Sequence, residues 1–279
     1  MRNLPVPGMD ALALFDKITG EKRGEVSARL GRLRRRISSA YASYQANTDA
    51  LQTIASAGIK GVREKALLHA YNSPTATMRS IRDNLIYPNI EDFDECPYCG
   101  INDPKTLDHY LPKETYPEFA VHPLNLIPIC HICNSHYKRS QFLDGGARLF
   151  MHSYFDTFPA FDFIQLQVIV NREVILSFTN SSDPANPDFS ILFGRHFRKL
   201  GLNERFVQKS AAEISRKRPA LRRFYRNGGA AEVAQVLQQE ANDFRVTLSG
   251  NHWKVALYSS LAGSQDFCDG GFLRTVKIR

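Results

Sequence analysis

Apolar residues in the first third of the chain recur every three or four positions, which is the period of a helix with one buried face. The clearest case is 25–47, where the apolar positions are Val26, Leu30, Leu33, Ile37 and Tyr41 or Tyr44. Patterns of the same kind at 50–70 and 76–86 predict two further helices. We therefore expect the chain to begin with a helical region.

Short apolar runs replace this period in the middle of the chain, and such runs are typical of strands. One run is Leu126–Ile129, a second lies around 107–111, and 130–142 has the character of a helix. The predicted order of strand, strand and helix is a ββα unit. Farther along, apolar runs at 164–170 and 173–178 flank Asn171-Arg172, which predicts a β-hairpin.

Helical periodicity returns at 190–200, at 203–226, at 229–246 and from about Trp253. The predicted fold class is α+β and mainly helical, with a central ββα unit, helical flanking regions and a β-hairpin. We divide the chain into an N-terminal helical region (1–90), a central core (91–145) and a C-terminal region of hairpin and helices (146–279). The passage from the first region into the core is expected between Asn84 and Glu95.

Composition is that of an ordinary globular protein. The 279 residues are 43% hydrophobic and 23% charged, enough for a substantial core in one or two domains. No apolar run approaches the length of about 20 residues that crosses a bilayer. No cleavage-site pattern follows the short apolar stretch near the start. We expect a soluble, cytoplasmic protein that has no membrane partner.

The net charge of +8 is unevenly distributed. Residues 1–90 hold 14 Lys/Arg and 7 Asp/Glu, 91–145 hold 4 and 9, and 146–279 hold 18 and 12. The local balances are therefore +7, −5 and +6. Basic flanks favour a polyanionic partner such as nucleic acid. The acidic centre needs its own explanation, and it contains four of the five cysteines.

The four cysteines form two C-x2-C pairs: Cys96 with Cys99, and Cys130 with Cys133. Each short spacer can turn both sulfurs to one side, so the two pairs can surround one tetrahedral metal ion. Four thiolates favour zinc. Two disulfides, or four free core cysteines, are the alternatives. Cys268 stands alone and is expected to pack as a small apolar residue.

The region 94–145 resembles the HNH endonucleases, the ββα-metal nucleases, in the form stapled by four cysteines. The matching elements, in order, are the first C-x2-C pair, Asp108-His109 with Pro112, Asn125-Leu126-Ile127, and Cys130-x-x-Cys133-Asn134. The family usually has a lysine soon after the cysteine-asparagine pair. Here Lys138 stands slightly farther along, after His136 and Tyr137.

The resemblance implies a phosphodiester-cleaving site with a ββα-metal core. His109 would be the general base, and Asp108 and Asn134 would bind a catalytic Mg²⁺ or Mn²⁺ through oxygen. Asn125 would be structural and would fix His109 in place. His136 would be a further metal ligand or phosphate contact, a role that the departure at Lys138 leaves open.

Simpler explanations exist for each of these residues. An isolated Asp-His pair on a strand often consists of two solvent-exposed polar side chains with no further role, and an asparagine near the start of a helix can merely cap it. His131 lies between two expected zinc ligands, and we expect it to contact those ligands or to be solvated rather than to bind the metal itself. His122 precedes Pro123 and has no partner that spacing assigns.

Arginines of the flanks are candidate contacts to nucleic acid, because guanidinium groups suit phosphates. The candidates, with one lysine of the core, are Arg32, Arg35, Arg36, Lys138, Arg218 and Arg222. Residues 195–226 hold 11 Lys/Arg and 2 Asp/Glu with interleaved aromatic residues, which also fits backbone contact and base stacking. The alternatives are a solvated basic helix face, and aromatic residues that belong to the core.

The layout as a whole is similar to the HNH subunits of Septu-type anti-phage defence systems, which work with an ATPase of the ABC or SMC-like kind. This second resemblance implies a separate ATPase partner, since the chain has no G-x4-G-K-[ST] loop. We therefore predict a metal-dependent endonuclease acting on DNA, or alternatively on RNA, in antiviral defence. Two other functions stay open: a zinc-dependent nucleic-acid-binding module without cleavage, and a subunit that mainly docks onto the ATPase.

Overall fold

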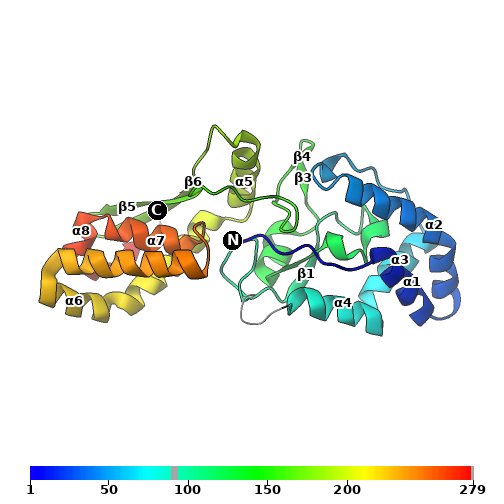
Figure 1. The fold of residues 1–279 in the computed structure, drawn as a ribbon, viewed down its shortest axis with the longest axis horizontal. Coiled ribbons are helices and arrows are strands. Elements are labelled where there is room, and N and C mark those ends of the chain that lie inside the picture. The colour runs from blue at the N-terminus through cyan, green and yellow to red at the C-terminus, as the bar shows by residue number, and fades with distance from the viewer. Residues whose placement is uncertain (89–93, 278–279) are drawn as a thin grey trace. The chain divides into compact units, whose positions relative to one another are not determined.

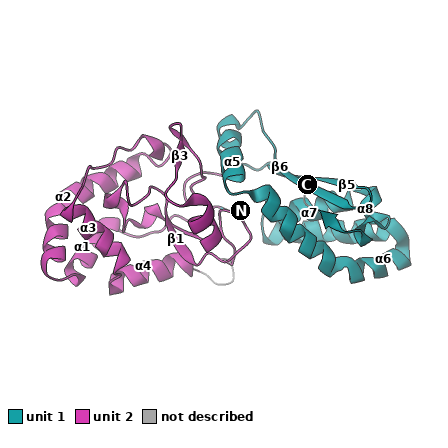
Figure 2. Ribbon diagram, turned by 180° about the vertical axis from the view of Figure 1, so that it is seen from behind, with its two compact units in different colours: residues 1–2, 158–279 teal, residues 3–157 magenta. Residues whose placement is uncertain are grey.

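The computed structural model of the chain describes residues 1–88 and 94–277. The fold is α+β and mostly helical, as the sequence predicts. It divides into two compact units, one of residues 3–157 and the other of residues 1–2 with 158–279 (Figure 2). Within the described ranges, no helix has the length and apolar character that crossing a membrane requires.

Helices form the first part of the 3–157 unit (Figure 1). They are α1 (Ala11–Glu21), α2 (Gly24–Ala46), α3 (Val62–Asn72) and α4 (Ala76–Ile86). Helix α2 confirms the prediction for 25–47, and Leu30, Leu33, Ile37, Tyr41 and Tyr44 are its buried residues. Val26 is half-buried, so the apolar stripe contacts the core fully only from the second turn onward.

The predicted helix at 50–70 is wrong in its first half. Only a 3-10 turn, η1 (Leu51–Thr53), precedes α3. Gly58 and Gly61 have φ values of +63° and +67°, a region that interrupts a right-handed helix. The chain turns there, and α3 starts directly after Gly61, whose N–H donates to Glu64 Oε2 at 3.2 Å. Helix α4 confirms the prediction for 76–86.

The central strands are confirmed. Strand β1 (Thr106–His109) pairs antiparallel with β2 (Leu126–Ile129), with Thr106 opposite Ile129 and His109 opposite Leu126. The connection contains two 3-10 turns, η2 (Pro117–Phe119) and η3 (Pro123–Asn125). A short ribbon, β3 (Leu143–Asp144) with β4 (Ala147–Arg148), follows.

The helix predicted at 130–142 is shorter and wider than expected. It is a π-helical segment, η4 (Ile132–Lys138). It stops at Arg139, where φ is +52°, and the Arg139 N–H donates to Asn134 O at 2.8 Å. The expected passage between Asn84 and Glu95 includes 89–93, which lie outside the described residues.

The second unit contains the predicted hairpin and the C-terminal helices. Strand β5 (Ile164–Val170) pairs antiparallel with β6 (Val174–Asn180), and β7 (Val276–Lys277) adds a parallel strand beside β6. The helical elements are α5 (Pro187–Lys199), α6 (Leu202–Thr247), α7 (Trp253–Ala262), α8 (Gln265–Cys268) and the 3-10 turn η5 (Gly271–Leu273). The two helices predicted at 203–226 and 229–246 are confirmed: they are the two parts of α6, which Gly229 separates with a non-helical backbone (φ +65°, ψ −153°).

Two of the four aromatic residues of 195–226 belong to the core. Phe197 and Phe206 are buried, and the Phe206 ring lies 5.3 Å from that of Phe178. This confirms the core alternative for these two rings and removes them as base-stacking surfaces. Cys268 is also buried, and its thiol donates to Leu261 O at 3.3 Å.

Candidate metal centre and active-site cavity

The four cysteines of the central segment converge on one point. The sulfurs of Cys96, Cys99, Cys130 and Cys133 all lie within 4.8 Å of one another, and all four residues are buried. Cys99 Sγ and Cys130 Sγ are 3.9 Å apart. A tetrahedron with Zn–S bonds of about 2.3 Å has S–S edges of about 3.8 Å, so the spacing suits this ion. The cluster could hold a zinc ion.

The chain builds each half of the cluster as a tight turn. At the first pair, the Gly100 N–H donates to Cys96 O at 2.7 Å, and a φ of +60° at Gly100 lets the backbone reverse. The second pair follows β2 directly, so the strand delivers Cys130 opposite the first turn. The predicted metal cluster is therefore assembled from two segments that the β1–β2 connection separates.

The geometry of the cluster excludes one alternative that the sequence left open, a pair of disulfides. The Cys130 N–H points to Cys96 Sγ at 3.3 Å, and the Cys133 N–H points to Cys130 Sγ at 3.4 Å. All are free cysteines, and 3.9 Å is far longer than an S–S bond of about 2.05 Å. Burial raises the pKa of the Cys96 thiol well above its ordinary value. Thiolates would therefore be stable in this buried site only beside a cation, which a bound metal ion would supply.

Beside this cluster, β1 and η4 line a cavity of about 280 Å³. Asp108 and His109 reach it from β1, and Asn134 reaches it from η4. The structure thus brings three of the predicted catalytic residues to one place. Adjacent positions on a strand normally face opposite sides. Here Leu107, Asp108 and His109, three consecutive residues of β1, all line the cavity.

His109 is held in one orientation. Its Nε2 lies 2.9 Å from Ala120 O, and its ring packs against the edge of Tyr71 at 4.4 Å between centroids. A carbonyl only accepts, so Nε2 carries the proton and Nδ1 keeps its lone pair. Burial lowers the pKa of His109 to about 3. The ring is therefore neutral at physiological pH, and Nδ1 carries a lone pair.

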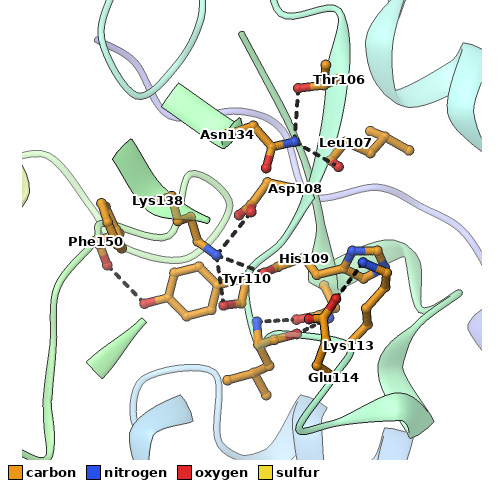
Figure 3. Close-up of polar contacts among 12 residues, drawn as sticks. Thr106, Leu107, Asp108, His109, Tyr110, Lys113, Glu114, Asn134, Lys138 and Phe150 are labelled. Carbon is orange, nitrogen blue, oxygen red and sulfur yellow. Dashed lines mark hydrogen bonds and ion pairs between the residues drawn. The ribbon is translucent and has the colours of Figure 1, made fainter. Parts of the chain in front are cut away.

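Asp108 pairs with a buried lysine. Lys138 Nζ lies 3.0 Å from Asp108 Oδ1 and also donates to His109 O at 2.9 Å (Figure 3). The other oxygen, Asp108 Oδ2, is buried and finds no hydrogen-bond partner among the described residues. Burial raises the pKa of the Asp108 carboxyl, and the Lys138 ammonium opposes that shift. One oxygen is thus neutralised by the protein and the other is left for a ligand.

The two asparagines have different surroundings. Asn125 is fully buried, accepts from the Leu111 N–H at 2.8 Å and donates to Leu111 O at 3.0 Å, so it clamps the loop after His109. Asn134 donates its amide N–H groups to Thr106 Oγ1 at 3.1 Å and Leu107 O at 3.3 Å. Its oxygen is turned toward the Asp108 carboxylate (Figure 3).

Three predicted residues do not line the cavity: Asn125, His136 and Lys138. His136 is exposed, and its ring lies 4.8 Å from that of Tyr137. Lys138 was expected to contact nucleic acid, and this expectation is corrected: the side chain is 0% exposed and neutralises Asp108 instead. His131 is exposed, as expected. His122 is buried, and its Nδ1 accepts from the Leu124 N–H at 3.1 Å.

The candidate arginines differ in whether their guanidinium groups form hydrogen bonds within the chain. Arg36 donates to Ala57 O, and Arg218 donates to Phe272 O at 3.1 Å and to Arg274 O at 2.7 Å. Contacts within the chain therefore occupy part of both groups. Arg32 and Arg35 on α2, and Arg222 on α6, are exposed.

Sequence reasoning missed several residues of the cavity. Lys113, Glu114, Tyr71 and Arg139 also line it. Lys113 follows the Asp108-His109 pair closely and could have been included on proximity alone. Tyr71 comes from α3, and only the tertiary fold brings that helix to β1.

Comparison with known proteins gives one distant relative. The chain is similar to Protein ea31 of Escherichia phage lambda, with 30% identity over 196 residues. The match covers 63% of this chain and 64% of the length of the phage protein. No family model matches the sequence, and no solved structure is similar to it.

Proposed function

We propose that the chain is a metal-dependent endonuclease of the HNH type that hydrolyses phosphodiester bonds of nucleic acid. The cavity carries the proposal. Three groups line it: a neutral imidazole, a buried carboxylate with one unpartnered oxygen among the described residues, and a side-chain amide. Proton transfer and cation binding are the two needs of this reaction, and these groups serve both. The β1–β2 pair followed by η4 would be the ββα-metal core.

His109 is the general base in this proposal. Its Nε2–H is fixed by Ala120 O, so Nδ1 takes the proton from a water molecule as that water attacks phosphorus. Tyr71 and Asn125 act through His109: the first packs against the ring, and the second clamps the loop that follows. The products would carry 5′-phosphate and 3′-hydroxyl ends.

The residues present fit a catalytic Mg²⁺ or Mn²⁺. Asp108 Oδ2 is an orphaned buried oxygen, and the Asn134 amide oxygen faces the same carboxylate. Both are hard donors of the kind that these cations prefer. When bound, such a cation polarises the phosphate and stabilises charge on the leaving oxygen. His136, being exposed, would have at most a phosphate-binding role.

A structural zinc on the four cysteines would support this site. Cys133 immediately precedes Asn134, and Cys130 immediately follows β2. The ion would therefore fix the start of η4 against the strand pair. That keeps the Asn134 oxygen on the side of Asp108, which lies on the strand opposite β2.

The substrate we favour is DNA, with RNA as the alternative, and the exposed arginines Arg32, Arg35 and Arg222 are candidate backbone contacts. We also propose a role in anti-phage defence with a separate ABC- or SMC-like ATPase. That part rests on the layout of the chain and on its lack of a P-loop. Co-purification of an ATPase from the native host tests it, and full cleavage by the isolated chain would argue against a gated subunit.

The experiment that separates a nuclease from a non-catalytic zinc module is cation binding at Asp108 and Asn134. Mn²⁺ titrated into the zinc-loaded protein is followed by electron paramagnetic resonance, with Asp108→Asn and Asn134→Ala as test variants. Asp103→Asn, an exposed carboxylate paired with Lys105 at 2.8 Å, is the matched control. We expect Mn²⁺ to bind the parent and the control and to bind the two test variants at least tenfold more weakly. Equal Mn²⁺ binding by all four proteins would refute a catalytic cation site at Asp108 and Asn134.

A further inference from the structure

Arg139 has a backbone conformation that arginine rarely adopts. Its φ is +52° with ψ of −129°, and Ser249 is the one other non-glycine residue of the described chain with positive φ. A side chain in this region costs on the order of 1–3 kcal/mol, which glycine avoids. Such strain is retained where the surrounding structure or a function requires the residue.

The fold forces the conformation at this position. Lys138 must turn inward to reach Asp108, and its side chain is fully buried. The next residue ends η4, and its N–H donates to Asn134 O at 2.8 Å. The abrupt reversal places the Arg139 side chain at the wall of the cavity that Asp108, His109 and Asn134 also line.

The charges around the cavity single out this guanidinium. Lys138 is bound to Asp108 at 3.0 Å, and Lys113 is bound to Glu114 at 2.8 Å. Arg139 also lines the cavity, and none of the ion pairs found in the described parts of the chain involves it. Its charge is thus available to an anion that enters the cavity. Guanidinium binds two phosphate oxygens at once, which suits a nucleic-acid backbone.

We propose that Arg139 binds a backbone phosphate of the nucleic acid in the cavity and positions the phosphodiester bond against His109. The inference rests on the proposed function and adds a substrate-binding residue to it. A solvated surface arginine would gain nothing from the strain, since glycine at this position would be more stable. The strain is explained if the residue is kept for its charge.

The test compares stability and binding in four variants of the full chain, each made in the cleavage-deficient His109→Ala background. They are Arg139→Gly, Arg139→Gln, Arg139→Lys and the control Arg63→Ala. Arg63 is exposed on α3 and does not line the cavity. The probes are a fluorescent DNA duplex, the same DNA as a single strand, and a structured RNA, each titrated at several salt concentrations.

We expect Arg139→Gly to raise Tm by about 2–4 °C while Kd for the preferred probe weakens about tenfold. Arg139→Gln should weaken Kd equally with an unchanged Tm, and its salt slope should fall by about one phosphate contact. Arg139→Lys should keep the salt slope, because the charge remains, but should weaken Kd by about threefold or more, because an ammonium cannot bind two phosphate oxygens in the guanidinium geometry. Arg63→Ala should match the parent.

The inference fails, and the proposed function stands, if the parent binds a probe and both Arg139→Gly and Arg139→Gln keep its Kd and salt slope. A fall in Tm for Arg139→Gly would likewise contradict it, because the side chain would then be stabilising the fold. If the parent binds none of the three probes, the proposed function fails and this inference fails with it.

Discussion

Lys138 Nζ lies 3.0 Å from Asp108 Oδ1, and the two side chains are 0% and 2% exposed. The lysine comes from the end of η4 and the aspartate from the middle of β1, so the pair joins the two elements that line the cavity. The ammonium also donates to His109 O at 2.9 Å and lies 5.9 Å from the centre of the Phe150 ring. One buried group thus holds both candidate catalytic residues of β1.

Replacing Lys138 with methionine should destabilise the 3–157 unit by about 3 kcal/mol, because Asp108 keeps its burial and loses its partner. Urea unfolding followed by circular dichroism measures the change. Adding Asp108→Asn gives the double variant. Its loss of unfolding free energy should be smaller than the sum of the losses in the two single variants. Strict additivity would mean that the two groups do not interact.

Removing the metal from the four cysteines should unfold the cavity. We expect one zinc per chain by elemental analysis, and a strong chelator should lower Tm by more than 10 °C, since folding and metal binding are coupled at such sites. Cys133→Ser should mimic the chelator, whereas Cys268→Ser, a buried thiol outside the cluster, should keep the zinc. A full zinc content in Cys133→Ser would contradict the assignment.

Glu21 should make the 3–157 unit lose stability in acid. Its carboxylate accepts hydrogen bonds from Thr77 Oγ1 at 2.7 Å and from the Thr77 N–H at 3.0 Å. These bonds join the end of α1 to the start of α4. Hydrogen bonds from Thr75 and Thr77 lower the pKa of Glu21 from 4.5 to about 2. The stabilisation is complete above pH 4.5 and is lost as pH falls toward 2.

Because Glu21 is exposed, solvent screening limits the effect to about 1 kcal/mol or less. Glu21→Gln should therefore unfold at slightly lower urea concentration than the parent at pH 6, and the difference should shrink toward pH 2.5. Glu25→Gln, on the first turn of α2, is the control. A difference that stays constant with pH would show that the carboxylate charge is not the cause.

Periodicity and spacing predicted much of this molecule. Helix α2, strands β1 and β2, the β5–β6 hairpin and the convergence of four cysteines all follow from local patterns. The error at 50–61 arose because Gly58 and Gly61 need positive φ, which a count of apolar positions does not register.

Lys138 shows what a local pattern cannot supply. A lysine in a polar segment is normally solvated, and its burial depends on a carboxylate 30 residues earlier in the sequence, at Asp108, that only the tertiary fold brings within reach. The backbone of Arg139 has the same origin, since the inward turn of Lys138 forces the reversal after it. Strand β7 was missed because two residues are too few to show any period.

The role of His109 as general base is the central claim, and one cleavage assay tests it most directly. The zinc-loaded parent, His109→Ala and the exposed-histidine control His69→Ala are incubated with Mg²⁺ and plasmid DNA, single-stranded DNA or structured RNA. We predict that the parent and His69→Ala cut at least one substrate, that EDTA stops both, and that His109→Ala is at least a hundredfold slower. Cleavage by His109→Ala at the parental rate would contradict the account.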